Sequence, residues 1–215
     1  HLKKVSKGFD NVAKFYDLLA FMVFGNQLRK AQIYFIKEIP SDSIIFIIGG
    51  GTGWLLAEVL NQIQIKEVIY IDASQKMLDL TYQKNNKHPQ FSKVKLVHGT
   101  EKNIKQYSQI DFLITPFILD VFTPTDLPIV IQELSKILKK EGKWLLVDFD
   151  GQQTKKGIAN FFVQLMYWFF TLTCSIPAKK LEDFENHILK TNWKREKANY
   201  FYFNMVKAVI LKKLF

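Results

Sequence analysis

Short apolar runs alternate along this chain with segments of helical periodicity. Runs rich in β-branched and aromatic residues predict strands at residues 44–48, 67–72, 94–97, 110–115 and 143–148. Apolar positions recurring at helical spacing predict helices between them, at residues 54–60, 74–85 and 126–140, with Gly142 placed where a helix C-terminal glycine belongs. This βαβα order predicts an α/β fold, a parallel sheet with helices on both faces.

The last third of the chain departs from simple alternation. Residues 181–190 have the pattern of a helix, and residues 197–203 and 206–212 resemble two strands on either side of Asn204. Such a pair favours an antiparallel hairpin that closes the sheet. We expect one domain over residues 1–215, with residues 1–40 as an N-terminal helical cap and residues 151–180 as a substrate lid.

A glycine-rich turn follows the first strand. The segment from Ile44 to Gly53 reads IIFIIGGGTG, and the helical repeat of WLLAEVL begins directly after it. A buried strand that turns through glycines into a helix is typical of a nucleotide-type site, because glycine permits unusual torsions and leaves room for a ligand. A nicotinamide-dependent dehydrogenase also fits this turn.

Composition narrows the class of protein. The 215 residues are 48% hydrophobic and 23% charged, which indicates a globular protein. The single cysteine, Cys174, excludes an intrachain disulfide framework and favours a cytoplasmic setting. The net charge of +10 comes almost wholly from scattered lysines, a pattern more typical of a solvated surface than of nucleic-acid recognition.

Four segments in order resemble the class I S-adenosylmethionine-dependent methyltransferases, and most closely the small-molecule group of ubiquinone and menaquinone biosynthesis. They are IIFIIGGGTG, VIYIDASQKML, IDFLITPFILDVF and ILKKEGKWLLVDF. The resemblance implies a Rossmann-like, doubly wound sheet of seven strands, mostly parallel with an antiparallel C-terminal strand. It also implies S-adenosylmethionine as cofactor and a small-molecule acceptor.

The same resemblance assigns cofactor contacts to individual residues. Three glycines would bring the backbone close to the methionine portion, and the acid that ends the second strand would accept hydrogen bonds from both ribose hydroxyls. Further positions would border the adenine, flank the sulfonium or help close the site. The cofactor-binding residues are therefore expected to be Tyr16, Gly49, Gly51, Gly53, Asp72, Ala73, Met77, Thr100, Glu101 and Thr115.

Two positions depart from the family pattern. Ile47 stands where the family has an acid two residues before the first glycine, and Thr100 stands where an acid often follows the third strand, with Glu101 one step further. The first of these acids helps to orient the amino group of the cofactor. Ile47 therefore predicts weaker cofactor binding, or another residue in that role.

No catalytic residue is identified from the sequence. If the acceptor must lose a proton, the candidates for the base are His98, Tyr16 and Asp120. Methyl transfer can proceed largely through positioning of donor and acceptor, so a conspicuous acid–base pair is unnecessary. The sequence contains no HExxH, CxxC or paired-histidine pattern, so no metal is expected.

Residues 161–176, FFVQLMYWFFTLTCSI, are apolar around most of a helical wheel but too short for a normal membrane span. They indicate a wall for an apolar acceptor, a dimer or membrane-surface contact, or an ordinary core helix. The leading interpretation is methyl transfer to a small, substantially apolar acceptor. The alternatives are a methyltransferase-like ligand-binding protein with little or no turnover, and an RNA or protein methyltransferase.

Overall fold

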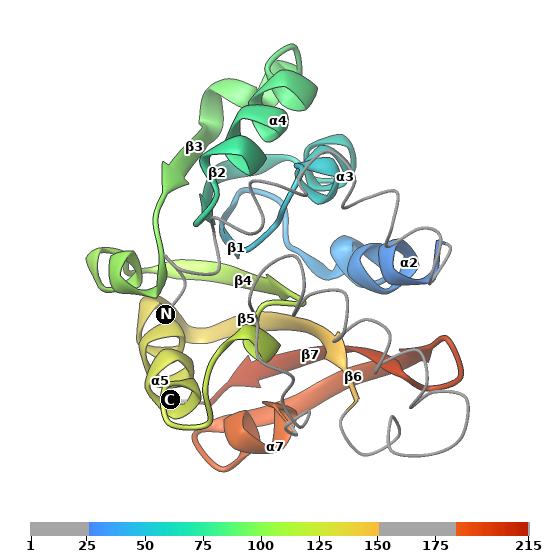
Figure 1. Ribbon diagram of the computed structural model, residues 1–215, viewed down its shortest axis with the longest axis vertical. Coiled ribbons are helices and arrows are strands. Elements are labelled where there is room, and N and C mark those ends of the chain that lie inside the picture. The colour runs from blue at the N-terminus through green and yellow to red at the C-terminus, as the bar shows by residue number, and fades with distance from the viewer. Residues whose placement is uncertain (1–25, 151–183, 215) are drawn as a thin grey trace.

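The computed structural model describes residues 26–150 and 184–214 (Figure 1). The predictions for Tyr16 and for residues 161–176 lie outside the described residues. So do most of the expected N-terminal cap and all of the expected lid, residues 151–180.

Seven strands form one sheet in the order β3-β2-β1-β4-β5-β7-β6. Strands β1 to β5 pair in parallel, whereas β7 runs antiparallel to both of its neighbours. The predicted fold class, a mostly parallel Rossmann-like sheet with an antiparallel last strand, is confirmed. The strands are β1 (Ser43–Ile48), β2 (Ile65–Asp72), β3 (Val94–His98), β4 (Ile110–Pro116), β5 (Leu138–Phe149), β6 (Trp193–Phe201) and β7 (Val206–Lys213).

Helices cover both faces of the sheet, as Figure 1 shows. One apolar core lies between the sheet and helices α5 and α7, and the other lies under α2, α3 and α4. Within residues 26–150 and 184–214, no helix is both long and apolar enough to cross a membrane. The helices are α2 (Gln27–Ile33), α3 (Trp54–Gln62), α4 (Gln75–Asn85), α5 (Leu127–Ile137) and α7 (Phe184–Leu189), with short 3₁₀ turns η1 (Ile36–Glu38), η2 (Pro89–Lys93), η3 (Glu101–Gln106) and η4 (Leu119–Val121).

The prediction of a helix through residue 140 that ends at Gly142 is wrong. Helix α5 ends at Ile137, and β5 begins at Leu138, whose side chain is buried against the core. The left-handed residue of this segment is Glu141, with φ of 65°. A glycine is nevertheless required at position 142, because a Cβ there would lie 2.9 Å from the carbonyl oxygen of Lys139.

The predicted hairpin between the last two strands is confirmed. Three consecutive residues at its tip, Tyr202, Phe203 and Asn204, have left-handed φ values of 48°, 55° and 63°. Strand β6 begins at Trp193, four residues earlier than predicted, because Trp193 already pairs with Lys213 of β7; its ring also packs edge-on against Trp144 of β5. The hairpin therefore adds two strands to the β5 side of the sheet.

A single glutamine fixes the chain at the edge of the sheet opposite the glycine turn. The Gln90 side chain accepts a hydrogen bond from the Ile65 amide (3.0 Å) and donates to the carbonyl oxygens of Leu60 and Ile63 (2.8 Å each). These groups belong to the end of α3, the loop after it and the start of β2. Gln90 therefore satisfies backbone groups that the C-terminus of α3 leaves open.

Candidate functional site

The glycine turn connects β1 to α3 and adopts the backbone torsions that its sequence predicts. Gly49, Gly51 and Gly53 have φ values of 72°, 68° and 79°, in the left-handed region that favours glycine. A Cβ at Gly53 would lie 2.7 Å from the Thr81 Cα, and a Cβ at Gly49 would lie 2.8 Å from Cδ1 of Ile118. Among the described residues, no atom lies within 4 Å of a Cβ placed at Gly51, so this part of the structure leaves the turn open on that side.

Asp72 ends β2 beside this turn, and backbone amides fix its carboxylate. The Ser74 amide donates to Oδ1 at 2.9 Å, and the Gly51 amide donates to Oδ2 at 3.2 Å. These two amides hold the carboxylate in one orientation beside the turn. Asp72 is 9% exposed, and its fixed orientation fits the predicted role at a ribose.

The segment after Asp72 leads directly into α4. Ser74 caps this helix by accepting a hydrogen bond from the Met77 amide, and the Met77 side chain is buried. A ring nitrogen of His98 lies 3.1 Å from the carbonyl oxygen of Ala73. The contact makes His98 part of the support for Ala73, on the side of Asp72 where the adenine is expected.

Thr100 and Glu101 follow β3 at the same edge of the sheet. Thr100 caps η3 together with Asn103, whose side chain accepts from the Thr100 amide at 3.0 Å. Within the described part of the chain, the buried Oε2 atom of Glu101 has no hydrogen-bond partner. A buried acceptor of this kind is costly unless a donor reaches it, so Glu101 fits a ligand with an exposed amino group.

Thr115 lies at the end of β4 with its side chain in the core. Its hydroxyl accepts a hydrogen bond from the Trp144 indole nitrogen at 2.8 Å, and the residue is fully buried. This contact fixes the Thr115 side chain within the sheet. Any part that Thr115 plays at the predicted sulfonium position therefore falls to its backbone.

Ile47 is fully buried in the apolar core beneath α2 and α3. The position that carries an acid in the resembling family thus contributes only packing here. The residue that contacts the first glycine comes instead from the loop after β4, where the Ile118 side chain packs against Gly49.

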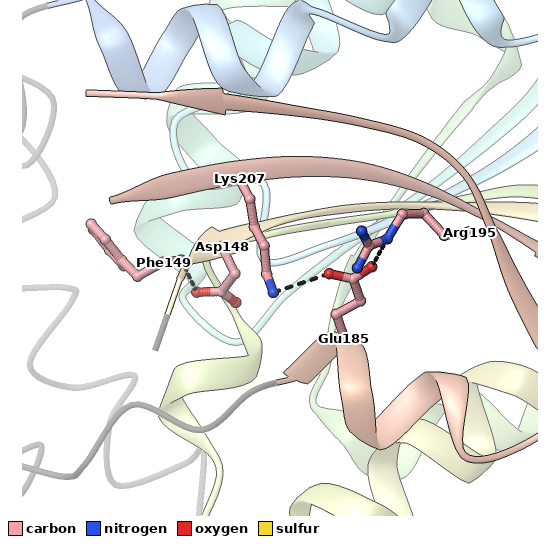
Figure 2. A network of polar contacts seen from close by, with 5 residues as sticks. All are labelled: Asp148, Phe149, Glu185, Arg195 and Lys207. Atoms are coloured by element: carbon pink, nitrogen blue, oxygen red, sulfur yellow. Dashed lines mark hydrogen bonds and ion pairs between the residues drawn. The ribbon is translucent and has the colours of Figure 1, made fainter. Parts of the chain in front are cut away.

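A cluster of charged groups lies near the end of β5 (Figure 2). Asp148 of β5 is paired across the sheet with Lys207 of β7, and both are buried. Lys207 donates to Glu185 of α7 at 3.1 Å, and Glu185 also accepts a hydrogen bond from Arg195 of β6. Sequence reasoning missed this cluster, because its members lie on four elements and have no local spacing.

Asp148 has a carboxyl group that favours its protonated form. Its Oδ1 atom accepts from the Phe149 amide at 2.9 Å, and Oδ2 has no hydrogen-bond partner among the described residues. Burial, and next the charge of Asp120, raise the pKa of Asp148 well above its ordinary value, while backbone hydrogen bonds and Lys207 act in the opposite direction. The charge of Asp120 thus favours a protonated Asp148 near the loop that contacts Gly49.

A known family model matches the segment that contains the glycine turn. Residues 45–142 match the family model described as a methyltransferase domain. The matched segment runs from β1 to the start of β5 and contains the glycine turn and Asp72. The predictions of an S-adenosylmethionine-dependent methyltransferase and of its cofactor are therefore confirmed, while membership of the ubiquinone and menaquinone group stays a prediction.

Solved methyltransferase structures share the fold. The N-methyltransferase NodS from Bradyrhizobium japonicum, in complex with S-adenosyl-L-homocysteine, is 11% identical, with a TM-score of 0.66 over 86% of this chain and 85% of NodS. The cyclopropane synthase MmaA2 from Mycobacterium tuberculosis is 12% identical, with a TM-score of 0.67 over 85% and 83%. A chain from the complex between the Haloferax volcanii Trm112 methyltransferase activator and a proposed methyltransferase is 11% identical, with a TM-score of 0.72 over 96% and 98%. No curated protein matches the sequence.

Proposed function

We propose that this methyltransferase binds S-adenosylmethionine across the glycine turn and transfers its methyl group to a small acceptor with an apolar body. The observation that carries the proposal is the open space beside Gly51, flanked by the fixed carboxylate of Asp72. A sulfonium cofactor supplies an electrophilic methyl carbon, whose bond to sulfur breaks as its bond to the acceptor forms. The protein then has to position the two reactants.

Individual residues receive distinct roles in this proposal. Gly51 leaves room for the methionine portion, and Asp72 accepts hydrogen bonds from the ribose hydroxyls. Ala73 and Met77 border the adenine ring, whose amino group donates to the buried Oε2 atom of Glu101. The family resemblance assigns to Tyr16 the role of helping to close the site.

The acceptor is proposed to lie at the ends of β4 and β5. The apolar composition of residues 161–176 supports an acceptor with an apolar body. Of the three candidate bases, Asp120 has the best support, because it follows β4 in η4 and interacts with Asp148. His98 lies on the Asp72 side and contacts Ala73 instead.

Isothermal titration with S-adenosylmethionine and S-adenosylhomocysteine tests the proposal, with NAD⁺ titrated in parallel. We expect micromolar binding of the two adenosyl ligands and none of NAD⁺. Asp72→Ala is expected to weaken binding by about 30-fold or more, because two hydrogen bonds to a carboxylate are lost. Asp79→Ala, on the exposed side of α4, is the matched control and should bind normally. Absence of binding at millimolar ligand would refute the proposal.

A second candidate function is ligand binding with little turnover, and Ile47 is the observation that favours it. An apolar, fully buried side chain at this position leaves the ammonium group of the cofactor without the acid that the family supplies. Mass spectrometry of S-adenosylhomocysteine formed with a panel of phenol, quinol, amine and fatty-acid acceptors distinguishes the two functions. Tight binding without product across the panel would favour the second.

The positive net charge gives little support to an RNA methyltransferase. Lysines on several strands are neutralised by acids, as in the ion pairs Lys95–Glu67, Lys143–Glu196 and Lys207–Glu185. Electrostatic binding of RNA would depend steeply on salt concentration. We expect no binding of a short RNA duplex at 150 mM salt that survives competition by heparin.

A further inference from the structure

Side chains from β2 and α4 donate hydrogen bonds to backbone carbonyl oxygens of the glycine turn. The carbonyl oxygen of Gly51 accepts hydrogen bonds from the Tyr70 hydroxyl and the Thr81 hydroxyl, each at 3.0 Å. The carbonyl oxygen of Gly53 accepts from the Asn85 side-chain amide at 3.0 Å. These three residues, Tyr70, Thr81 and Asn85, are called the turn brace below.

The three donors of the turn brace differ in how their protons are shared among acceptors. Tyr70 has one proton and directs it to Gly51, whereas the Thr81 hydroxyl divides its single proton between Gly51 and the Met77 carbonyl at 2.8 Å. Asn85 has two amide protons and uses the second for the Thr81 carbonyl at 2.9 Å. Tyr70 is therefore the principal donor to Gly51.

The turn needs such a brace because its own residues do not hold a conformation. Glycine visits left-handed and right-handed torsions with similar ease, so a run of glycines is not fixed by local sterics. Peptide units are planar and trans, so fixing the Gly51 carbonyl also fixes the Thr52 amide in the opposite direction. The brace thereby sets where the amides of the turn point at the start of α3.

The Tyr70 ring also accounts for the middle glycine of the GGG sequence. A Cβ at Gly50 would lie 2.4 Å from the Tyr70 hydroxyl and 2.5 Å from its Cε2 atom. Gly50 has no left-handed φ, so its backbone alone does not require glycine. Tyr70 occupies the volume of a side chain at position 50 and uses its hydroxyl to hold the next carbonyl.

We propose that Tyr70, assisted by Thr81 and Asn85, is a positioning residue that holds the glycine turn in the shape that receives the methionine portion of the cofactor. The inference rests on the proposed cofactor site. It assigns a functional role to side chains that point away from the open side of Gly51 and act only through the backbone.

The first test is Tyr70→Phe, which keeps the ring against Gly50 and deletes only the hydroxyl. We expect the Kd for S-adenosylmethionine to rise about three- to tenfold, the range for one neutral hydrogen bond. We expect kcat at saturating cofactor to change less than KM. Tyr107→Phe is the matched control, because Tyr107 packs against Phe46 on the other face of the sheet and should leave the Kd unchanged.

The second test separates positioning from simple stability at Thr81. Thr81→Val keeps the shape of the side chain and removes the hydroxyl, whereas Thr81→Ser keeps the hydroxyl and removes a methyl group. Positioning predicts that Thr81→Val raises the Kd about threefold and that Thr81→Ser binds nearly as the native protein does. All affinities are measured well below the unfolding temperature of each variant.

The outcomes separate the two proposals. If the native protein binds neither S-adenosylmethionine nor S-adenosylhomocysteine, the proposed cofactor site fails and the brace has no function to serve. If the native protein binds and both Tyr70→Phe and Thr81→Val retain its Kd, the cofactor site stands and the brace is overturned. A Kd that rises equally in Thr81→Ser and Thr81→Val would also overturn it, because loss of packing would then explain the effect.

Discussion

The glycine turn after β1 and the charged cluster around β5 and β7 are held together by different kinds of interaction. At the glycine turn, neutral hydroxyl and amide groups hold backbone carbonyls, and the carboxylate of Asp72 accepts from backbone amides. At the β5–β7 end, ionisable groups are buried together, with Lys207 between Glu185 and Asp148 (Figure 2). Neutral hydrogen bonds give a shape that is insensitive to pH, whereas buried charges make the local structure depend on protonation.

The largest loss of stability is expected when Lys207, the central cation of the charged cluster, is removed. Lys207→Met leaves Glu185 buried with Arg195 as its remaining charged partner, and we expect a loss of about 3–5 kcal/mol in the free energy of unfolding. Urea titration measures the loss. Lys212→Met is the control, because its partner Glu141 is exposed, and its unfolding midpoint should scarcely move. Similar losses in both variants would contradict the assigned importance of burial.

Two substitutions in the glycine turn are expected to differ: Gly53→Ala mainly lowers stability, whereas Gly51→Ala mainly weakens cofactor binding. Gly53→Ala places a Cβ 2.7 Å from the Thr81 backbone at a φ of 79°, so we expect it to cost about 2–3 kcal/mol in the free energy of unfolding. The Cβ of Gly51→Ala meets no atom of residues 26–150 or 184–214, so the variant should cost about 1 kcal/mol, from its left-handed φ. Gly51→Ala should nevertheless weaken cofactor binding at least tenfold. Normal binding by Gly51→Ala would show that the open side is not the cofactor side.

Stability is expected to depend on pH through Asp148 of the charged cluster, and not through the hydrogen bonds of the glycine turn. Because the pKa of Asp148 is raised in the folded protein, the folded state keeps its proton where the unfolded state has lost it. Stability therefore falls as pH rises from the ordinary value of 3.8 toward the folded pKa, by at most about 1.4 kcal/mol per pH unit. The stability of Asp148→Asn relative to the native protein should grow over the same window. Thermal unfolding from pH 4 to pH 8 measures it, and a constant difference would contradict the assignment.

A small effect that does not depend on pH is expected in the core between the glycine turn and the charged cluster. Thr115→Val keeps the shape of the side chain but leaves the Trp144 indole N–H without its acceptor, so we expect a loss of about 1–2 kcal/mol. The loss should not vary with pH, since neither group titrates near neutrality. Urea titration at pH 5 and pH 8 tests both statements.

The sequence predicts the fold well, because the order of strands and helices follows from local patterns. The run from Ile44 to the glycines, and the acid at the end of VIYID, identify a strand, a turn and a second strand end without tertiary information. The end of α5 was predicted wrongly, since Gly142 marks a close approach to Lys139 and not a helix terminus.

The supports of the site could not be predicted from the sequence. Tyr70 and Asn85 lie 19 and 32 residues from the glycines whose carbonyls they hold, and each reads locally as a strand or helix residue. Likewise, Lys207 and Glu185 are 22 residues apart on different elements. Such pairs depend on how α4 and α7 are packed against the sheet, which hydrophobic periodicity does not specify.

Gln90, at the far edge of the sheet, limits how much the site can move. It holds the end of α3 through Leu60 and Ile63, while Asn85 holds the start of the same helix through Gly53. A helix fixed at both ends has little freedom to slide or tilt when a ligand arrives. We therefore expect the amides of α3 to exchange slowly with solvent before the cofactor binds, and the cofactor to add little further protection there.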